Sequence, residues 1–124
     1  MTDPNTTIDT YFRMWNETDP ATRGELVGQV FTEDGRHVDP LADVAGYPAI
    51  DQMVAGVQDH YPGATLRRTS AIDLHHDQAR YGWELRTPDG TVVVSAIDVA
   101  RLADDGRIEH VAAFFGDLSA ELAA

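Results

Sequence analysis

The sequence predicts an α+β fold in which three N-terminal helices pack on a curved antiparallel sheet and enclose a pocket. Apolar residues recur at helical spacing in three segments within the first 60 positions. One short strand lies among these helices, and four strands separated by tight turns follow from residue 66 onward. This separation of helices from strands is typical of the α+β class, and a strongly bent sheet around a helix leaves a cavity between the two layers.

The predicted helices have recognisable starts or ends. The first begins after Asp3, since an aspartate cap followed by Pro4 suits the first helical turn. The second is expected over 21–31, and the third over 48–60, where a Pro-Gly pair follows. The apolar face of the first helix contains Ile8, Tyr11, Phe12 and Trp15.

The strand predictions rest on alternation of apolar and polar residues and on turn signals. A short strand over 36–39 ends at Pro40, because the residue before a proline is held extended. Longer strands are expected over 66–74, 81–86, 92–102 and 108–115. The stretch 92–100 is almost entirely apolar, so both of its faces need cover. We expect the helices to cover one face and a second copy of the chain to cover the other, which predicts a homodimer.

Composition limits the possible functions. The chain of 124 residues, with 43% hydrophobic and 24% charged residues, suits one domain spanning 1–124. Its net charge of −12 argues against nucleic acids and anionic membranes as partners, since both need a basic surface. All nine basic residues are arginine and cysteine is absent, which excludes Schiff-base and thiolate catalysis as well as disulfides.

No cofactor is expected. Nucleotide-binding motifs such as the P-loop and the Gly-x-Gly-x-x-Gly turn are absent from the sequence. The N-terminus lacks the basic and apolar regions of a signal peptide, and no apolar stretch approaches the length of a membrane span. We therefore expect a soluble cytoplasmic protein.

Asp98 interrupts the apolar strand over 92–102. Burying a carboxylate there costs several kcal/mol unless the group is paired, hydrogen-bonded or protonated, and desolvation raises its pKa. A protonated carboxyl can donate a hydrogen bond to a developing oxyanion. The alternative is a structural aspartate that accepts hydrogen bonds from the backbone or from an arginine such as Arg68 or Arg101.

Asp39 ends the short strand, directly before Pro40. It is either a turn residue or a general base at the pocket mouth. His37 lies two residues earlier and therefore points to the same face, where the two side chains could share a proton or bind a metal. Two ligands are too few for a metal site, so none is expected. The buried Tyr11 is a core aromatic whose hydroxyl needs a partner, which a ligand could supply.

Four segments together resemble ketosteroid isomerase and the wider SnoaL-like, nuclear transport factor 2-like superfamily. They are Ile-Asp-Thr-Tyr at 8–11, His-Val-Asp-Pro at 37–40, Ala-Ile-Asp at 96–98 and Ala-Phe-Phe-Gly at 113–116. The resemblance spans nearly the whole chain and implies a cone-shaped, cystatin-like fold. In ketosteroid isomerase an aspartate moves a proton beside a carbonyl, while a tyrosine and a protonated aspartate hold the enolate oxygen.

Transferred by position, the resemblance implies Asp39 as the base, with Tyr11 and Asp98 as the oxyanion donors. The pocket is then expected to be lined by Trp15, His37, Met53, Val54, Trp83, Val111 and Phe115. Two departures stand out. The isomerase's further pocket tyrosine on helix three falls near Met53 and Val54 here, and the stretch between Tyr11 and Asp39 is a few residues longer.

The predicted function is cofactor-free, acid-base proton transfer next to a carbonyl of a small apolar or polycyclic compound, as in an isomerase or a polyketide cyclase. The superfamily also contains dehydratases, epoxide hydrolases and proteins without known catalysis. The alternative is therefore a non-catalytic domain that binds an apolar ligand or mediates dimerisation. In that case Asp39 and Asp98 are structural.

Overall fold

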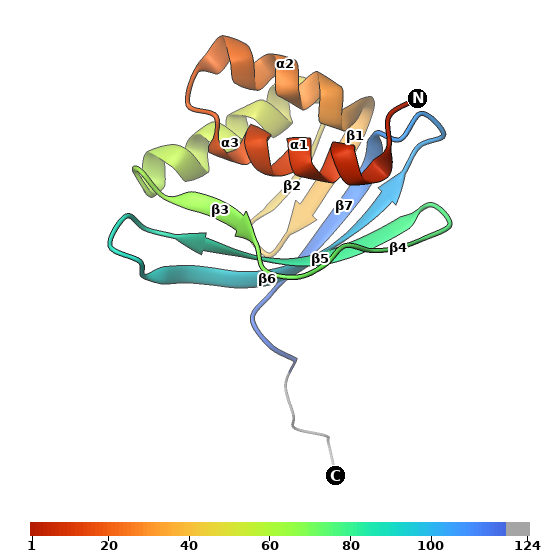
Figure 1. Cartoon of the computed structure of the whole chain (residues 1–124). Helices are drawn as coiled ribbons and strands as arrows, with labels where there is room; N and C mark the ends of the chain where they lie inside the picture. Colours follow the sequence, from red (N-terminus) through yellow and green to blue (C-terminus); the bar gives the residue numbers. More distant parts are fainter. Residues whose placement is uncertain (119–124) are drawn as a thin grey trace.

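Three helices precede most of the sheet in the computed structural model, which describes residues 1–118 (Figure 1). They are α1 (Pro4–Asn16), α2 (Pro20–Val30) and α3 (Tyr47–His60). Helix α1 begins as predicted, because the Asp3 carboxylate accepts a hydrogen bond from the Asn5 amide at 2.8 Å. Within 1–118, none of the helices combines the length and the apolar character that crossing a membrane requires. Residues 119–124, the end of the predicted domain, lie outside the described residues.

Seven strands form one curved, mixed sheet. They are β1 (Phe31–Asp39), β2 (Ala42–Ala45), β3 (Thr65–Arg68), β4 (Asp73–His75), β5 (Gln78–Arg86), β6 (Val92–Leu102) and β7 (Ile108–Phe115). Their order across the sheet is β2-β1-β7-β6-β5-β3, and β4 also pairs with β5. The predicted α+β class is confirmed, although the pairing of β1 with β7 is parallel rather than antiparallel.

Several strand predictions differ from the structure: the strand expected from residue 81 begins at Gln78, and β2 was not predicted. The strand expected over 36–39 begins already at Phe31, because the polar residues 32–34 continue β1 as an irregular segment rather than a turn. The register of its pairing with β7 shifts between Phe31 and Arg36. The strand expected over 66–74 is two strands, since the Ser70 hydroxyl accepts the Gly82 amide proton at 2.8 Å where the ladder is interrupted.

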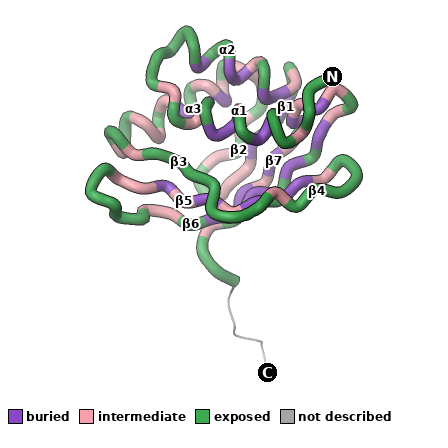
Figure 2. The backbone as a smooth tube through the Cα atoms, in the orientation of Figure 1, coloured by how far each residue is buried: buried purple, intermediate pink, exposed green. Residues whose placement is uncertain are grey.

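The helices cover the concave face of the sheet, and the buried residues gather between the two layers (Figures 1 and 2). Alternation along β5 and β6 turns Tyr81, Trp83, Ala96 and Asp98 inward. The buried residues Ile8, Tyr11 and Met14 of α1 belong to the core on this side of the sheet. The pocket-bearing layer is therefore built between α1, α3 and the inner side of the sheet.

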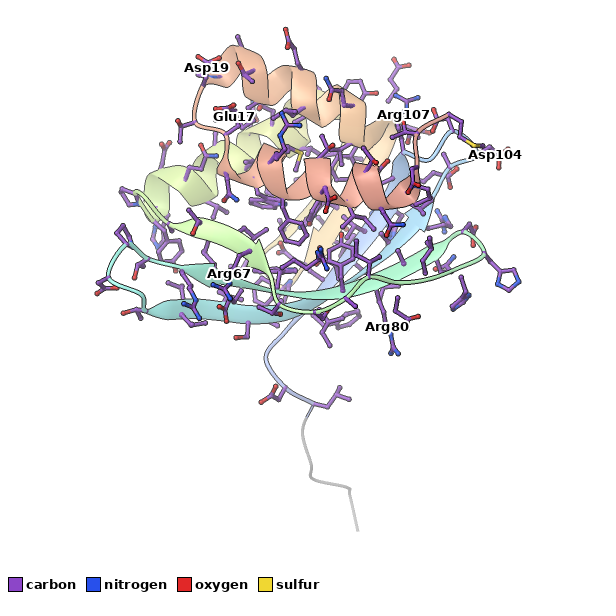
Figure 3. All side chains as sticks on the ribbon, viewed as in Figure 1. Glu17, Asp19, Arg67, Arg80, Asp104 and Arg107 are labelled. Atoms are coloured by element: carbon purple, nitrogen blue, oxygen red, sulfur yellow. The ribbon has the colours of Figure 1, made fainter. Side chains whose placement is uncertain are left out.

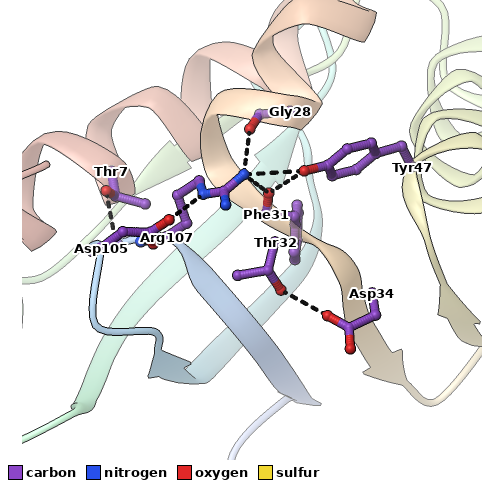
Figure 4. A network of polar contacts seen from close by, with 9 residues as sticks. Thr7, Gly28, Phe31, Thr32, Asp34, Tyr47, Asp105 and Arg107 are labelled. Carbon is purple, nitrogen blue, oxygen red and sulfur yellow. Dashed lines mark hydrogen bonds and ion pairs between the residues drawn. The ribbon is translucent and has the colours of Figure 1, made fainter. Parts of the chain in front are cut away.

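Arg107, at the turn into β7, links the helices to the sheet (Figure 4). Its guanidinium donates hydrogen bonds to the carbonyl oxygens of Gly28 and Phe31 at 3.4 and 3.3 Å, and to the Tyr47 hydroxyl at 3.1 Å. Its Nε also pairs with Asp105 at 2.8 Å. One side chain thus joins the end of α2, the start of β1 and the start of α3 to the strand that follows.

The outer face of the sheet carries exposed apolar side chains. Ile97 and Phe114 are direct cross-strand partners on β6 and β7, and they are 49% and 66% exposed. Val99 lies beside them, 38% exposed. Arg80 projects from the same outer side of the sheet, away from the helices (Figure 3). Within one chain, the second apolar face of β6 is therefore uncovered, and the homodimer stays a prediction.

Candidate active site

A cavity of about 320 Å³ opens between the inner face of the sheet and the helices. Its wall is mainly aromatic and aliphatic, with contributions from α1, β1, α3 and the strands β3, β5, β6 and β7. Polar side chains on the wall come from His37, Asp39, His60 and Tyr61. Among the described residues, no arginine lines it. An apolar cavity with a few polar groups at one place is typical of a small-molecule site.

His37 and Asp39 are brought together on this wall by the alternation of β1. The His37 Nε2 lies 2.9 Å from the Asp39 Oδ2, and the two side chains are 2% and 12% exposed. The other carboxylate oxygen, Oδ1, accepts hydrogen bonds from the amides of Leu41 and Ala42, each at 2.8 Å. The turn after β1 therefore holds the Asp39 carboxylate in a fixed orientation at the cavity.

The hydrogen bonds to Asp39 favour its ionised form. Burial raises the pKa of the Asp39 carboxyl, but the donors on His37, Leu41 and Ala42 outweigh burial and leave that pKa below its usual value. An ionised carboxylate can only accept hydrogen bonds. The His37 Nε2 therefore carries a proton and donates a hydrogen bond to the Asp39 carboxylate.

Asp98 is fully buried on the inner face of β6. Its Oδ1 accepts a hydrogen bond of 2.7 Å from the indole Nε1 of Trp83, a residue of the cavity wall. Burial raises the pKa of Asp98, and the hydrogen bond from Trp83 offsets only part of that rise. Arg101 pairs with Glu109 and Arg68 donates to the Ser70 carbonyl, so neither arginine is the partner of Asp98 within 1–118.

Tyr11 lies next to Asp98, behind the cavity wall. Burial raises the pKa of the Tyr11 hydroxyl well above its usual value, and the nearby Asp98 carboxylate raises it further. The Tyr11 ring contacts those of Trp15 and Tyr81, with centroids 6.4 and 6.0 Å apart. Asp39 therefore faces the cavity, whereas Tyr11 and Asp98 touch the wall residues Trp15 and Trp83 from behind.

The other predicted pocket residues divide into two groups. The structure places Trp15, His37, Met53, Trp83 and Phe115 on the cavity wall. Val54 and Val111 are fully buried in the core and do not line the cavity. Adjacent residues on a helix point about 100° apart, so the neighbour of Met53 turns into the core.

The sequence analysis did not identify four further residues that line the cavity. Leu41 and Ala42 line it and supply the two amides that hold Asp39. His60 and Tyr61 line it at the end of α3, with ring centroids 4.6 Å apart. The only available signal was two adjacent aromatic rings directly before the Pro-Gly pair that ends this helix.

Comparisons with known proteins identify the family of this chain. No protein-family profile and no curated protein matches the chain. Among solved structures, it is similar to a proposed isomerase of the SnoaL-like family from Agrobacterium tumefaciens str. C58. That structure has 36% sequence identity and a TM-score of 0.86, and the match covers 94% of this chain and 100% of the other.

Two further structures share the fold at lower identity. An NTF2-like protein of unknown function from Exiguobacterium sp. 255-15 has 24% identity and a TM-score of 0.71, over 90% of this chain and 99% of the other. A proposed polyketide cyclase from Sinorhizobium meliloti has 17% identity and a TM-score of 0.70, over 87% and 93%. The match to the Agrobacterium tumefaciens protein covers almost the whole of both chains at 36% sequence identity, which is more than a shared fold alone would show. The chain therefore belongs to the SnoaL-like family.

Proposed function

We propose that this protein is an enzyme that moves a proton next to a carbonyl of an uncharged apolar or polycyclic compound, without a cofactor, as an isomerase or a polyketide cyclase does. The observation that carries the proposal is the ionised Asp39 carboxylate, held by His37 and two amides on the wall of an apolar cavity. The SnoaL-like relative proposed to be an isomerase supports the same class of reaction.

In this mechanism Asp39 is the general base. Its carboxylate accepts a proton from the carbon beside the carbonyl, and the electron pair of the broken C–H bond moves to the carbonyl oxygen, which gives an enolate. Asp39 then returns the proton to another carbon and becomes a carboxylate again. His37 positions Asp39 through the 2.9 Å contact and does not touch the reacting carbon.

The enolate needs stabilisation, because a carboxylate with a lowered pKa is a weak base. We assign this task to buried polar residues that lie behind the part of the cavity wall formed by Trp15 and Trp83. Tyr11 and Asp98 remain our candidates for supporting the oxyanion from behind that wall, since burial favours the protonated form of both groups. Preorganised neutral donors of this kind stabilise developing charge where water is excluded.

The wall chemistry supports an uncharged substrate. The described part of the cavity wall includes the anionic Asp39 and no arginine that could neutralise a substrate carboxylate or phosphate. Trp15, Trp83 and Phe115 present aromatic surfaces, which suit a flat ring system. A planar ketone with one exchangeable proton beside its carbonyl fits these conditions.

The experiment is a proton-exchange assay on a panel of uncharged cyclic ketones, including β,γ-unsaturated ones. Exchange in deuterium oxide is followed by NMR, and isomerisation by the absorbance of the conjugated product. Asp39→Asn is expected to slow both reactions by about 10²–10⁴-fold, since the amide cannot accept the proton. The control is Asp43→Asn, which removes an exposed carboxylate that pairs with Arg36 on the neighbouring strand.

An alternative function is supported by one specific observation. All hydrogen bonds to Asp39 come from its own turn and from His37, which is also what a purely structural turn aspartate would show. A non-catalytic domain would then bind apolar ligands in the same cavity. Wild-type protein that binds ketones of the panel but accelerates neither exchange nor isomerisation would replace our proposal with this one.

A further inference from the structure

Three residues of the cavity wall are also exposed to solvent. They are Leu41 in the turn between β1 and β2, Gly56 in α3, and His60, the last residue of α3. The other wall residues are buried or half-buried. A residue that both lines a cavity and is exposed lies where the cavity opens, so these three residues mark the mouth of the cavity.

Gly56 lies on the side of α3 that forms the wall. Met53, Val57 and His60 line the cavity with it, and their spacing of three, one and four residues from Gly56 places all four on one face of the helix. The fully buried Val54 points into the core, about 160° around the helix from Gly56. Gly56 is therefore at the outer edge of the wall-forming face, next to the mouth.

The space in front of Gly56 is empty. Apart from the backbone of its own helix and its two chain neighbours, a Cβ atom added to Gly56 would meet no atom of the described residues within 4 Å. Packing therefore leaves room for a side chain at this position. A glycine inside a helix lowers stability relative to alanine, but here it also keeps the mouth of the cavity wide.

Leu41 provides apolar surface at the same mouth, from a different element. This residue is 87% exposed. A single exposed leucine is common on protein surfaces, but Leu41 borders an apolar cavity, and its backbone is fixed because its amide donates a hydrogen bond to the Asp39 Oδ1 at 2.8 Å. A ligand that projects through the mouth would cover the Leu41 side chain and remove apolar surface from water.

We propose that Gly56 and Leu41 select long substrates, that is, polycyclic compounds whose far end projects through the mouth of the cavity. The proposal rests on the proposed function, because it takes the cavity to be the substrate site. The cavity volume of about 320 Å³ is at the low end of the range for small-molecule sites, about 300–1,000 Å³. A long polycyclic compound is therefore enclosed only in part. Its remaining rings pass Gly56, which leaves room for them, and pack against Leu41.

The test compares two uncharged ketones with the same reactive end, 2-tetralone and the longer 6-phenyl-2-tetralone. Binding to the full-length protein is measured by calorimetry or by ligand-observed NMR. The wild type is expected to bind the longer ketone about tenfold more tightly, the effect of covering part of one further ring with apolar surface. Gly56→Phe is expected to bring this ratio of affinities close to one, because the added ring occupies the mouth. Gly24→Phe is the control and should leave the ratio unchanged, since Gly24 is an exposed glycine of α2 with equally open space that does not line the cavity.

A second variant tests the apolar contact at the mouth. Leu41→Ala keeps the backbone amide that holds Asp39 and removes most of the exposed side chain. It is expected to lower the ratio of affinities by about 2–5-fold, the effect of losing a small apolar contact area. Leu118→Ala is its control, because Leu118 is 97% exposed and lies away from the cavity wall. If Gly56→Phe does not fold, Gly56→Leu and Leu41→Ala still decide the question.

The proposal is overturned if the wild type binds 6-phenyl-2-tetralone no more tightly than 2-tetralone, or if the ratio of affinities is unchanged by a larger side chain at position 56 or by Leu41→Ala. Failure of the proposed function appears in a different measurement. A wild type that binds both ketones but exchanges no proton beside the carbonyl contradicts the proton-transfer function. The ratio of affinities needs no chemical step, so it still decides whether Gly56 and Leu41 select the length of the ligand.

Discussion

At the scale of single residues, two buried carboxyl groups on the same inner face have opposite electrostatic properties. Asp39 accepts hydrogen bonds from two amides and an imidazole, and these donors lower its pKa despite burial. Asp98 accepts one, from Trp83, and burial dominates and raises its pKa. The balance between burial, which is complete for Asp98 and only partial for Asp39, and the hydrogen bonds that each carboxyl accepts therefore decides which carboxyl can act as an ionised base and which is held closer to its neutral form.

The raised pKa of Asp98 predicts a pH-dependent cost to stability. The folded state binds the Asp98 proton more tightly than the unfolded state, whose pKa is near 3.8, so the stabilisation is present below that pH and is lost as the pH rises through the folded value. Relative to Asp98→Asn, which stays neutral, the wild type should lose stability as the pH rises above about 4. Urea unfolding of both proteins across this range measures the difference.

Asp98→Leu provides the matched control for this measurement. An asparagine oxygen can still accept the Trp83 N–H at 2.7 Å, whereas leucine leaves that buried donor unpaired. The leucine variant should therefore be less stable than Asp98→Asn by about 1–3 kcal/mol at every pH. A stability difference between the wild type and Asp98→Asn that does not change with pH would show that Asp98 has the same pKa in the folded and unfolded states.

At the scale of elements, the cavity depends on how the end of α1 is attached to the edge strand β3. The Asn16 side chain spans the two. Its amide nitrogen donates to the Leu66 carbonyl and its oxygen accepts from the Leu66 amide, both at 2.8 Å. Leu66 is also part of the cavity wall, and Trp15 precedes Asn16 in α1. This side chain therefore closes the edge of the sheet and positions two wall residues at the same time.

Asn16→Ala should loosen this attachment. Both backbone groups of Leu66 lose their partner, which is expected to lower the free energy of unfolding by about 1–3 kcal/mol and to speed hydrogen exchange at the Leu66 amide. Asn16→Asp, which keeps the acceptor and loses the donor, should give an intermediate loss. Exchange at the Leu66 amide that is equally slow in Asn16→Ala and in the wild type would mean that α1 does not hold β3 in place.

At the scale of the whole molecule, the outer face of the sheet predicts self-association. Ile97, Val99 and Phe114 form a contiguous apolar patch on β6 and β7, opposite the face that carries the cavity. The charged Arg80, Arg101 and Glu109 border the patch. In a dimer with two-fold symmetry, the apolar patch of one copy would cover the same apolar patch of the other copy.

We expect a homodimer at roughly tens of micromolar, a concentration at which a specific interface of ordinary size is occupied. Light scattering coupled to gel filtration measures the mass. Phe114→Glu should give a monomer that still folds, because Phe114 is largely exposed in the single chain. A monomeric wild type at this concentration, or a Phe114→Glu variant that remains dimeric, would exclude this face as the interface.

Local sequence was sufficient for the features that depend on neighbouring residues. Asp3 and Pro4 set the start of α1, and the helical spacing of Tyr11 and Trp15 put both on its inner side. The period of two along β1 put His37 and Asp39 on one face, which is the feature that the proposed function uses most. These predictions needed no knowledge of what packs against each element.

The tertiary structure alone decided which residues meet across elements and how deep each lies. The hydrogen bond from Trp83 to Asp98 depends on the register of β5 with β6, and the placement of Asp98 behind rather than on the cavity wall depends on the curvature of the whole sheet. Periodicity predicts the face to which a side chain points, but not the partner strand or the depth, because both arise from contacts between residues far apart in sequence.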